Sequence, residues 1–287
     1  MWLRAARLPT LTAAITPVLV GSAVPAASGR FDAVVFAAAL GGALLIQVGA
    51  NYANDLFDFQ KGADAADRLG PTRVTATGAV TQRQIAIATV VVFTLAALCG
   101  GLLLAKGGVI VLVVGLASIV AALTYVGGPW PYGYHGLGDV ACFVFFGVVP
   151  VATLELLHGG ALTPASIGAA LPVGCLISAI LVVNNLRDLE QDRMSGKRTL
   201  AVILGDGPTR LEWALLVGLA YAMPAAGVLA GLWGAGALVA WLSAPLALRL
   251  AILLRRERGR SLNAVLRDTA RLNLLFNALF ALGLILR

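Results

Sequence analysis

Charged residues are scarce in this sequence, and their scarcity argues against a soluble fold. Only 12% of the 287 residues are charged, against about 25% in an ordinary soluble domain, and 59% are hydrophobic. One soluble core cannot bury so much apolar surface, and the mean hydropathy of +0.89 indicates lipid as the main solvent. The alternating pattern of a membrane β-barrel is also missing, so membrane-spanning α-helices are expected.

Cysteine and histidine are equally sparse. Cys99, Cys142 and Cys175 each lie alone inside an apolar segment, without the spacing of a disulfide framework or a thiolate metal site. We expect all three to be buried small hydrophobic residues. The two histidines, His135 and His158, are too few and too far apart for a histidine-based metal site.

Long apolar segments are abundant instead. Nine of them can cross a bilayer as helices, for which about 17–25 residues suffice: 10–27, 32–54, 84–105, 108–126, 137–157, 165–186, 211–230, 233–254 and 269–286. Arg4, Arg7 and the apolar residues after them also resemble a cleavable signal peptide, but Pro9 and Pro17 fit that interpretation poorly. We therefore expect an all-α polytopic membrane protein with nine transmembrane helices and termini on opposite sides.

The basic residues are distributed unevenly between the two sides of this topology. With a cytoplasmic N-terminus, seventeen Lys and Arg residues fall in cytoplasmic segments and only Arg30, Lys106 and Arg287 on the outer side, while Arg249 lies within the eighth span. This positive-inside bias predicts that orientation. Topology and contact with anionic lipid therefore explain the net charge of +7, and no nucleic-acid partner is expected.

Two polar sequences interrupt the apolar pattern at equivalent places. "NYANDLFD" begins at Asn51, near the end of the second segment, and "NNLRDLEQD" begins at Asn184, near the end of the sixth. Each has an Asp four residues after its first Asn and another three or four residues later. We interpret residues 1–287 as one integral membrane domain with parallel pseudo-repeat halves, about 8–126 and 137–254, and a ninth helix at 269–286.

The polar residues of each sequence fall on one face of a helix. The first set is Asn51, Asp55 and Asp58, and the second set is Asn184, Asp188 and Asp192. If the two faces meet, their carboxylates need a compensating cation at low dielectric. Asp and Asn oxygens suit Mg²⁺, which also binds phosphate oxygens, so the sequence predicts a metal-bound pyrophosphate.

Basic residues near the two motifs are candidate anion contacts: Lys61, Lys197 and Arg198. Topology alone also accounts for Arg68, Arg73, Arg187 and Arg193, so their role stays open. The alternative for both motifs is an ordinary polar helix end in a charged loop. That alternative leaves the matched positions of the motifs in the two halves unexplained.

The sequence "YVGGPWPYGYHGLGDV", from Tyr125 to Val140, joins the fourth and fifth segments. Its two prolines and its glycines predict a rigid, non-helical connector. Tyr125 and the aromatic residues after it either line a pocket or form an interfacial belt. Asp139 lies at the start of the fifth segment, where an acid is costly unless it serves a function.

At these residues the sequence resembles the UbiA superfamily of intramembrane prenyltransferases, most closely its 1,4-dihydroxy-2-naphthoate polyprenyltransferase branch. The resemblance rests on "NYANDLFDFQKGAD", "YVGGPWPYGYHGLGD", "NNLRDLEQDRMSGKRTLAVILG" and, more weakly, "RLPTLTAAITPVLVGSA". It implies a nine-helix bundle around a central cavity open sideways to lipid. The implied metal ligands are Asp55, Asp58, Asp188 and Asp192, and the implied diphosphate contacts are Asn51, Asn54, Asn184, Asn185 and Lys197.

The resemblance also implies the reaction: Mg²⁺-dependent transfer of a polyprenyl group from a polyprenyl diphosphate to an aromatic ring. In the naphthoate branch the acceptor loses CO₂, and the product serves menaquinone synthesis. The expected location is the bacterial cytoplasmic (inner) membrane, with the active site toward the cytoplasm. Asp139 or Tyr125 is expected to orient or deprotonate the ring hydroxyl. "PWPYGYH" lacks the basic residue of some relatives, which leaves the substrate preference there open.

Three alternative functions remain. In the first, the chain is also a prenyltransferase, but its acceptor is 4-hydroxybenzoate or another aromatic compound. A cation-coupled transporter also places acids in repeated halves, but transporter acids usually lie near the bilayer midplane, whereas both motifs here end a span on the same side. A catalytically silent scaffold leaves the four motif aspartates unexplained.

Overall fold

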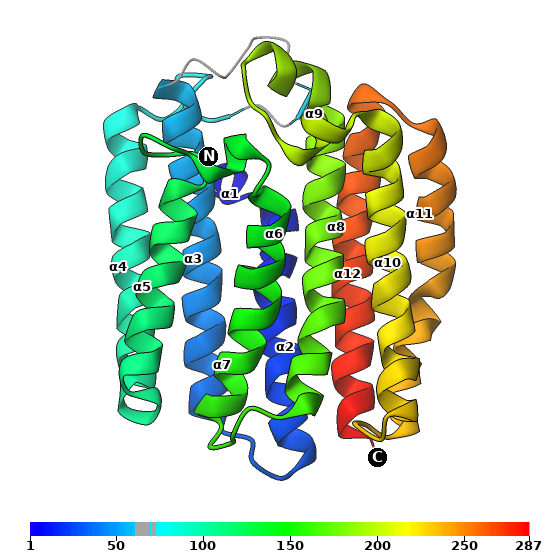
Figure 1. Cartoon of the computed structure of the whole chain (residues 1–287). Coiled ribbons are helices and arrows are strands. Elements are labelled where there is room, and N and C mark those ends of the chain that lie inside the picture. Colours follow the sequence, from blue (N-terminus) through cyan, green and yellow to red (C-terminus); the bar gives the residue numbers. More distant parts are fainter. Residues whose placement is uncertain (61–68, 71–72, 287) are drawn as a thin grey trace.

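The structure, a computed structural model, describes residues 1–60, 69–70 and 73–286. These residues form helices and connections, with no strand among them, and the long helices lie side by side in one bundle (Figure 1). The N-terminus lies toward one end of the bundle and the C-terminus at the other. The predicted all-α membrane fold is confirmed.

Each of the nine predicted apolar segments contains a helix. These are α2 (Thr12–Ala27), α3 (Ala33–Gln60), α4 (Gln82–Gly107), α5 (Val109–Thr124), α6, η3 and α7 (Gly138–Phe143, Val144–Val148 and Val149–Leu157), α8 (Pro164–Met194), α10 (Asp206–Leu229), η4 and α11 (Ala235–Ser243 and Ala244–Arg256), and η5 and α12 (Gly259–Ser261 and Leu262–Ile285). Within the described ranges, eight segments are long and apolar enough to cross a bilayer, and α5 is a shorter apolar helix. The remaining short helices are α1 (Trp2–Ala5), η1 (Leu8–Leu11), η2 (Tyr132–His135) and α9 (Leu200–Leu204).

Two helices continue six or more residues beyond the C-terminal ends of their predicted apolar segments, and both extensions carry a polar motif. α3 continues to Gln60 instead of ending near residue 54, and α8 continues to Met194 instead of ending near 186. The 28 residues of α3 measure about 42 Å at roughly 1.5 Å per residue, which exceeds the ~30 Å hydrocarbon core of a bilayer. The apolar pattern marks only the part of a helix that lies in lipid, so it misses these extensions.

The central helix is α8, which contacts α2, α6, α7, α10 and α12. Where α8 crosses η3, a Cβ added to Gly147 would lie 2.5 Å from the Gly174 Cα. Small residues let membrane helices approach this closely. The crossing holds the α6–α7 segment against α8, and both elements form walls of the site described below.

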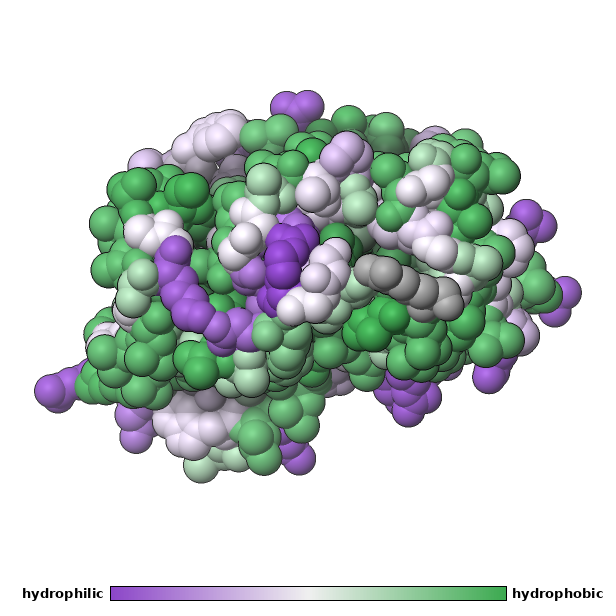
Figure 2. All heavy atoms as spheres, turned by 90° about the horizontal axis from the view of Figure 1, so that it is seen from below, coloured by the Kyte–Doolittle hydropathy of each residue, from purple (hydrophilic) through white to green (hydrophobic). Residues whose placement is uncertain are grey.

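The end of the bundle that holds the C-terminus carries its own polar cluster. Arg30 Nη2 donates to Glu155 Oε1 at 2.9 Å, and Lys106 pairs with Asp32. The Asp32 N–H donates to His158 Nδ1 at 3.0 Å. Figure 2 shows this end of the molecule: most of it is apolar, and hydrophilic side chains gather near its middle. The cluster ties the α2–α3 connection to α4 and α7.

Candidate active site

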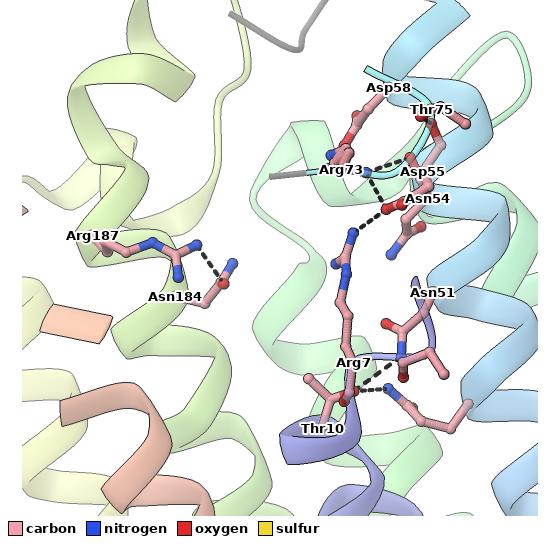
Figure 3. Close-up of polar contacts among 12 residues, drawn as sticks. Arg7, Thr10, Asn51, Asn54, Asp55, Asp58, Arg73, Thr75, Asn184 and Arg187 are labelled. Carbon is pink, nitrogen blue, oxygen red and sulfur yellow. Dashed lines mark hydrogen bonds and ion pairs between the residues drawn. The ribbon is translucent and has the colours of Figure 1, made fainter. Parts of the chain in front are cut away.

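The first motif lies on the last turns of α3, where its side chains are almost fully buried. Asn51, Asp55 and Asp58 are 4%, 1% and 2% exposed. Asn51 Nδ2 donates to the Ala6 carbonyl at 2.8 Å and to Thr10 Oγ1 at 3.0 Å (Figure 3). These two hydrogen bonds hold the N-terminal segment against α3 beside the acids.

Two arginines neutralise the acids of the first motif. Arg73 Nη1 lies 3.2 Å from Asp55 Oδ1 and donates to the Asn54 carbonyl at 2.7 Å, while its Nη2 pairs with Asp58. Arg7 reaches the same Asp55 oxygen from the N-terminal segment (Figure 3). Arg7 has a φ of 52°, and non-glycine residues in this left-handed region concentrate at functional sites. The α3 acids are therefore held by guanidinium groups from two separate segments.

The second motif is organised around Arg187, which is only 3% exposed. Its Nε and Nη2 donate to the two carboxylate oxygens of Asp188 at 2.7 and 2.5 Å. Its remaining donors reach Asn184 Oδ1 and Asn263 Oδ1, each at 2.9 Å. Asn185 is also buried on α8. In Figure 3, Arg187 and Asn184 lie on the opposite side of the site from Arg7 and the α3 acids.

Lys197 connects the two motifs. Its Nζ lies 3.4 Å from Asp58 Oδ1 and 3.8 Å from Asp192 Oδ1, so one ammonium group contacts acids of both α3 and α8. The ammonium also lies over the Tyr134 ring, 4.7 Å from the centroid. The structure therefore brings the two predicted motifs together at Lys197, although they lie in different halves of the sequence.

The connector between α5 and α6 packs onto this cluster through Tyr134. The Tyr134 hydroxyl donates to Asp58 Oδ1 at 2.6 Å, and the Arg198 N–H donates to the Tyr134 carbonyl at 2.9 Å. Burial, and then the negative charge of Asp58, raise the pKa of Tyr134 above its ordinary value. Tyr134 therefore keeps its proton and acts as a donor to the carboxylate. Lys61, the other predicted anion contact, lies outside the described residues.

A cavity of about 1330 Å³ begins beside the two motifs and continues between the helices. Polar side chains line one end: Arg7, Asn51, Asn54, Asn184, Arg187, Arg260, Asn263 and Arg267. Mostly apolar and small side chains of α2 to α8 and α12 line the rest. The volume exceeds the roughly 300–1,000 Å³ of pockets for drug-sized ligands. The cavity suits a large ligand with a polar head and an apolar body.

The aromatic residues of the connector divide between the two predicted roles. Tyr125 and Tyr132 line the cavity with their rings edge to face, 5.4 Å apart, whereas Trp130 is 56% exposed and stacks on His135. Asp139 is 7% exposed, and neither of its carboxylate oxygens has a hydrogen-bond partner among the described residues. Asp139 is not among the residues that line the cavity, but Gly138 directly before it is.

Comparison with known proteins bears directly on this arrangement. Residues 14–277 match the UbiA prenyltransferase family. The chain belongs to this family. It is 38% identical to the 1,4-dihydroxy-2-naphthoate octaprenyltransferase of Escherichia coli (strain K12), over 99% of this chain and 95% of that relative. It is 41% identical to the protein of the same name from Mycobacterium tuberculosis, over 93% of this chain and 91% of that relative.

Solved structures share the UbiA fold at lower identity. A UbiA homolog from Archaeoglobus fulgidus bound to GPP and Mg²⁺ matches with a TM-score of 0.68 and 15% identity, over 100% of this chain and 99% of that chain. The apo UbiA homolog from Aeropyrum pernix K1 matches with a TM-score of 0.69 and 18% identity, over 97% and 96%. The prediction of an integral membrane prenyltransferase of the UbiA family is confirmed.

The oxygen donors of this UbiA-family chain fit a divalent cation that binds together with a diphosphate. No group of three or more His, Cys, Asp or Glu side chains forms a ready-made metal site within the described ranges. The buried Asn54 Oδ1 has no hydrogen-bond partner there either, and it lies on the same helix as Asp55 and Asp58. Mg²⁺ usually takes one or two carboxylates and completes its shell with water and substrate phosphate, which this donor set allows.

Sequence patterns alone assign no role in the site to three of its arginines. The positive-inside distribution explains Arg73 and Arg187 as well as an anion contact does, and it is the only explanation that the sequence offers for Arg7. Arg7 lies 48 residues from Asp55, and no sequence pattern links the two. For Arg187, its position directly before Asp188 on a buried helix was an available signal, because a buried acid needs a nearby cation.

Proposed function

We propose that this chain transfers a polyprenyl group from a polyprenyl diphosphate to 1,4-dihydroxy-2-naphthoate, releasing diphosphate and CO₂, as a step of menaquinone synthesis. One observation carries the proposal: two Asn/Asp motifs meet at Lys197 beside the polar end of a cavity of about 1330 Å³. The naphthoate octaprenyltransferase names of relatives at 38% and 41% identity support this acceptor.

The shape and polarity of the cavity divide the donor between two environments. The cationic and amide groups at the polar end suit the diphosphate, and the apolar walls suit the polyprenyl chain. Apolar walls also keep water away from the allylic carbon while it carries positive charge. The ring of the acceptor then attacks that carbon, rather than water.

The charges at the polar end explain why a divalent cation would accompany the diphosphate. The described contacts join the four motif aspartates to four cations: Arg7, Arg73, Arg187 and Lys197. A diphosphate entering alone adds negative charge next to four buried or half-buried carboxylates. Bound Mg²⁺ would offset this charge and act as a Lewis acid toward the leaving diphosphate. Asp55, Asp58, Asp188 and Asp192 are its proposed ligands, with Asn54 as a further oxygen donor.

The cationic side chains have a direct role in the step. Arg73 lies between Asp55 and Asp58, and Lys197 lies between Asp58 and Asp192. With a metal-bound diphosphate in the site, these donors would be placed to bind phosphate oxygens and would stabilise the charge that develops on them. Breaking the allylic carbon–oxygen bond leaves the electron pair on the diphosphate, where these cations lie.

The acceptor binds on the Tyr125 side of the cavity in this proposal. Tyr125 lines the cavity and can donate a hydrogen bond to a ring oxygen, and the carboxylate of Asp139, which follows the cavity-lining Gly138, is the proposed acceptor of the ring hydroxyl proton. Arg260 and Arg267 line the cavity near Asn263 and can pair with the carboxylate of an aromatic acid. These residues supply the anion contact that the connector lacks.

We further propose that the motif end of the bundle faces the cytoplasm of a bacterial cell, in the cytoplasmic membrane. The positive-inside distribution of Lys and Arg supports this orientation. Cytoplasmic placement gives a charged diphosphate direct access to the polar end of the cavity.

The proposal is tested with purified protein in lipid nanodiscs, Mg²⁺, octaprenyl diphosphate and a panel of aromatic acids that includes 1,4-dihydroxy-2-naphthoate and 4-hydroxybenzoate. Products are identified by mass. We expect a prenylated, decarboxylated naphthol product and no comparable product from 4-hydroxybenzoate. Folded protein that prenylates no acceptor contradicts the proposed activity, and preference for another acid corrects the substrate only.

A further inference from the structure

Arg187, the buried arginine of the second motif, keeps one N–H donor available to a ligand. A guanidinium group carries five N–H donors in one plane. Nε and Nη2 of Arg187 use three of them on Asp188 and Asn184, and Nη1 uses one on Asn263 (Figure 3 shows the contact with Asn184). The second N–H of Nη1 has no partner among the described residues. Arg187 lines the cavity, so a ligand oxygen at the polar end can accept this donor.

Asn263, in the first turn of α12, holds Arg187 through that same nitrogen atom. Its Oδ1 accepts from Arg187 Nη1 at 2.9 Å, although 76 positions separate the two residues. Because both N–H groups of Nη1 lie in the guanidinium plane, the bond to Asn263 fixes where the other one points. Asn263 is half-buried and lines the cavity as well. This uncharged side chain therefore sets the direction of a cationic donor.

Two further segments of the chain hold Asn263 in place. Its Nδ2 donates to the Leu69 carbonyl at 2.8 Å and to the Arg260 carbonyl at 3.0 Å. Leu69 and Gly70 follow the first motif in the sequence, and both line the cavity. A Cβ at Gly70 would lie 2.8 Å from Arg187 Nη2 and 3.0 Å from its Cζ, so the backbone lies directly against the guanidinium group. The position of Arg187 therefore depends on residues from both halves of the sequence.

A carboxamide is the group that satisfies all these contacts of Asn263. The guanidinium group can only donate and the two carbonyls can only accept, so one short side chain must supply an acceptor and two donors. An aspartate would accept from Arg187 but would not donate to the carbonyls, and an apolar side chain would do neither. The partners also fix which end of the amide is oxygen.

We propose that Asn263 is a positioning residue of the transfer reaction: it orients Arg187 so that the remaining Nη1–H binds a phosphate oxygen of the polyprenyl diphosphate. This inference rests on the proposed function, because it needs a diphosphate at the polar end of the cavity. Asn263 acts through Arg187 and does not itself bind the phosphate. Its loss weakens binding of the diphosphate and leaves binding of the acceptor unchanged.

The test measures the binding of farnesyl thiolodiphosphate, with Mg²⁺, to the purified protein in nanodiscs by isothermal titration. Sulfur replaces the bridging oxygen of this analogue, so affinity is measured without turnover. Asn263→Ala is expected to raise the Kd about tenfold, the order for one hydrogen bond to a charged group. In steady-state assays the KM of the aromatic acceptor should stay at its wild-type value.

Ser261→Ala is the matched control for a general loosening of the start of α12. It removes the hydrogen bonds of Ser261 with the backbone of Arg258, close to Asn263 in the sequence, and Ser261 does not line the cavity. This variant should bind the analogue like wild type. Equal weakening in Ser261→Ala and Asn263→Ala overturns the inference.

A double-mutant cycle shows whether Asn263 acts through Arg187. Arg187→Lys keeps a cation beside Asp188 but has no Nη1. Adding Asn263→Ala to Arg187→Lys should change the Kd by about twofold or less, whereas a further loss of about tenfold in that background overturns the inference, as does a wild-type Kd in Asn263→Ala alone. If Arg187→Lys does not fold, Gly70→Ala takes its place in the cycle, because the added Cβ displaces the guanidinium group.

The outcomes also separate this inference from the proposed function. Wild-type protein that binds the analogue but prenylates no acceptor contradicts the proposed function alone, and the cycle still decides the role of Asn263 in binding the diphosphate. Wild-type protein that does not bind the analogue overturns the inference. Turnover of octaprenyl diphosphate by the same preparation would then leave the proposed function intact.

Discussion

Lys197 Nζ lies 3.4 Å from Asp58 Oδ1, although 139 positions separate the two residues in the sequence. The same ammonium lies 3.8 Å from Asp192 Oδ1, so it contacts one acid of each motif. An ammonium at this position offsets the mutual repulsion of carboxylates on α3 and α8. It also stands where the phosphate oxygens of a metal-bound donor are expected.

Replacing Lys197 should therefore impair catalysis more than folding. In Lys197→Met we expect kcat/KM to fall about 10²-fold or more, the usual loss when one donor to a developing negative charge is removed. Lys197→Arg should keep most of the activity because it keeps the charge. Arg271→Met, which removes an exposed cation outside the cavity, is the control. Steady-state kinetics with octaprenyl diphosphate and Mg²⁺ measure the difference, and a loss of twofold or less in Lys197→Met contradicts the assignment.

Each motif should be required separately. Asp55→Asn and Asp188→Asn remove one charge from α3 and α8 respectively, with little change in volume. We expect both variants to lose at least 10²-fold in kcat/KM, while Asp206→Asn, at an acid that pairs with Arg210 and Arg258 outside the cavity, stays near wild type. Chelation with EDTA should abolish turnover, and added Mg²⁺ should restore it. A wild-type rate in either motif variant removes that residue from the site.

Arg73 should substitute for part of the cation charge in the metal-free protein. It is 6% exposed and pairs with both Asp55 and Asp58, so Arg73→Ala leaves two buried acids without this partner. Breaking such a buried pair costs about 3–5 kcal/mol. We expect a lower melting temperature without metal, and a larger rise on adding Mg²⁺ than in wild type. Equal responses of the two proteins to Mg²⁺ would show that Arg73 and the cation do not share these carboxylates.

Asp139 should act on the acceptor and not on the donor. Its carboxylate lacks a hydrogen-bond partner among the described residues, and Tyr125 and Gly138, the residue directly before Asp139, line the cavity. In Asp139→Asn we expect kcat to fall about 10²–10⁴-fold, the usual contribution of a general base, with the KM for polyprenyl diphosphate unchanged. An Asp139→Asn effect confined to the KM of the donor places this residue with the diphosphate site instead.

The sequence predicted those features that depend on periodicity and repetition. Apolar segments located the helices, and the matched Asn51 and Asn184 motifs predicted that two polar faces meet. Such patterns do not predict contacts that depend on how the helices pack. Arg7 itself has a left-handed backbone conformation, and from the N-terminal segment its side chain reaches Asp55 on α3. A Cβ at Gly107 would lie 2.4 Å from Val111 Cγ2 and 2.6 Å from Leu157 Cδ2, and no spacing in the sequence marks this close approach of α4 to α5 and α7.

The polar cluster of Arg30, Asp32, Lys106, Glu155 and His158, at the end of the bundle that holds the C-terminus, should make stability depend on pH through His158. The Asp32 N–H donates to His158 Nδ1 at 3.0 Å, so this nitrogen carries no proton, and Nε2 lies 3.0 Å from Ser22 Oγ. Burial lowers the pKa of His158 from 6.5; Asp32 opposes this shift, whereas Lys106 and Arg30 add to it. Because the folded-state pKa is the lower one, the unfolded chain takes up this proton first as the pH falls. The stability from neutral His158 is therefore complete above pH 6.5 and is lost as the pH falls through the folded-state pKa.

Thermal unfolding in nanodiscs between pH 8 and pH 5 tests this sign. Protonation of Nδ1 breaks the hydrogen bond from Asp32, a net loss near 1 kcal/mol, so wild type should lose roughly 2–4 °C more than His158→Gln over this range. His135→Gln is the matched control, because His135 stacks on the exposed Trp130 at the opposite end of the bundle. It should keep the wild-type pH dependence. If His158→Gln keeps that dependence as well, the titrating group lies elsewhere, and the bond between Asp32 and His158 does not couple proton uptake to unfolding.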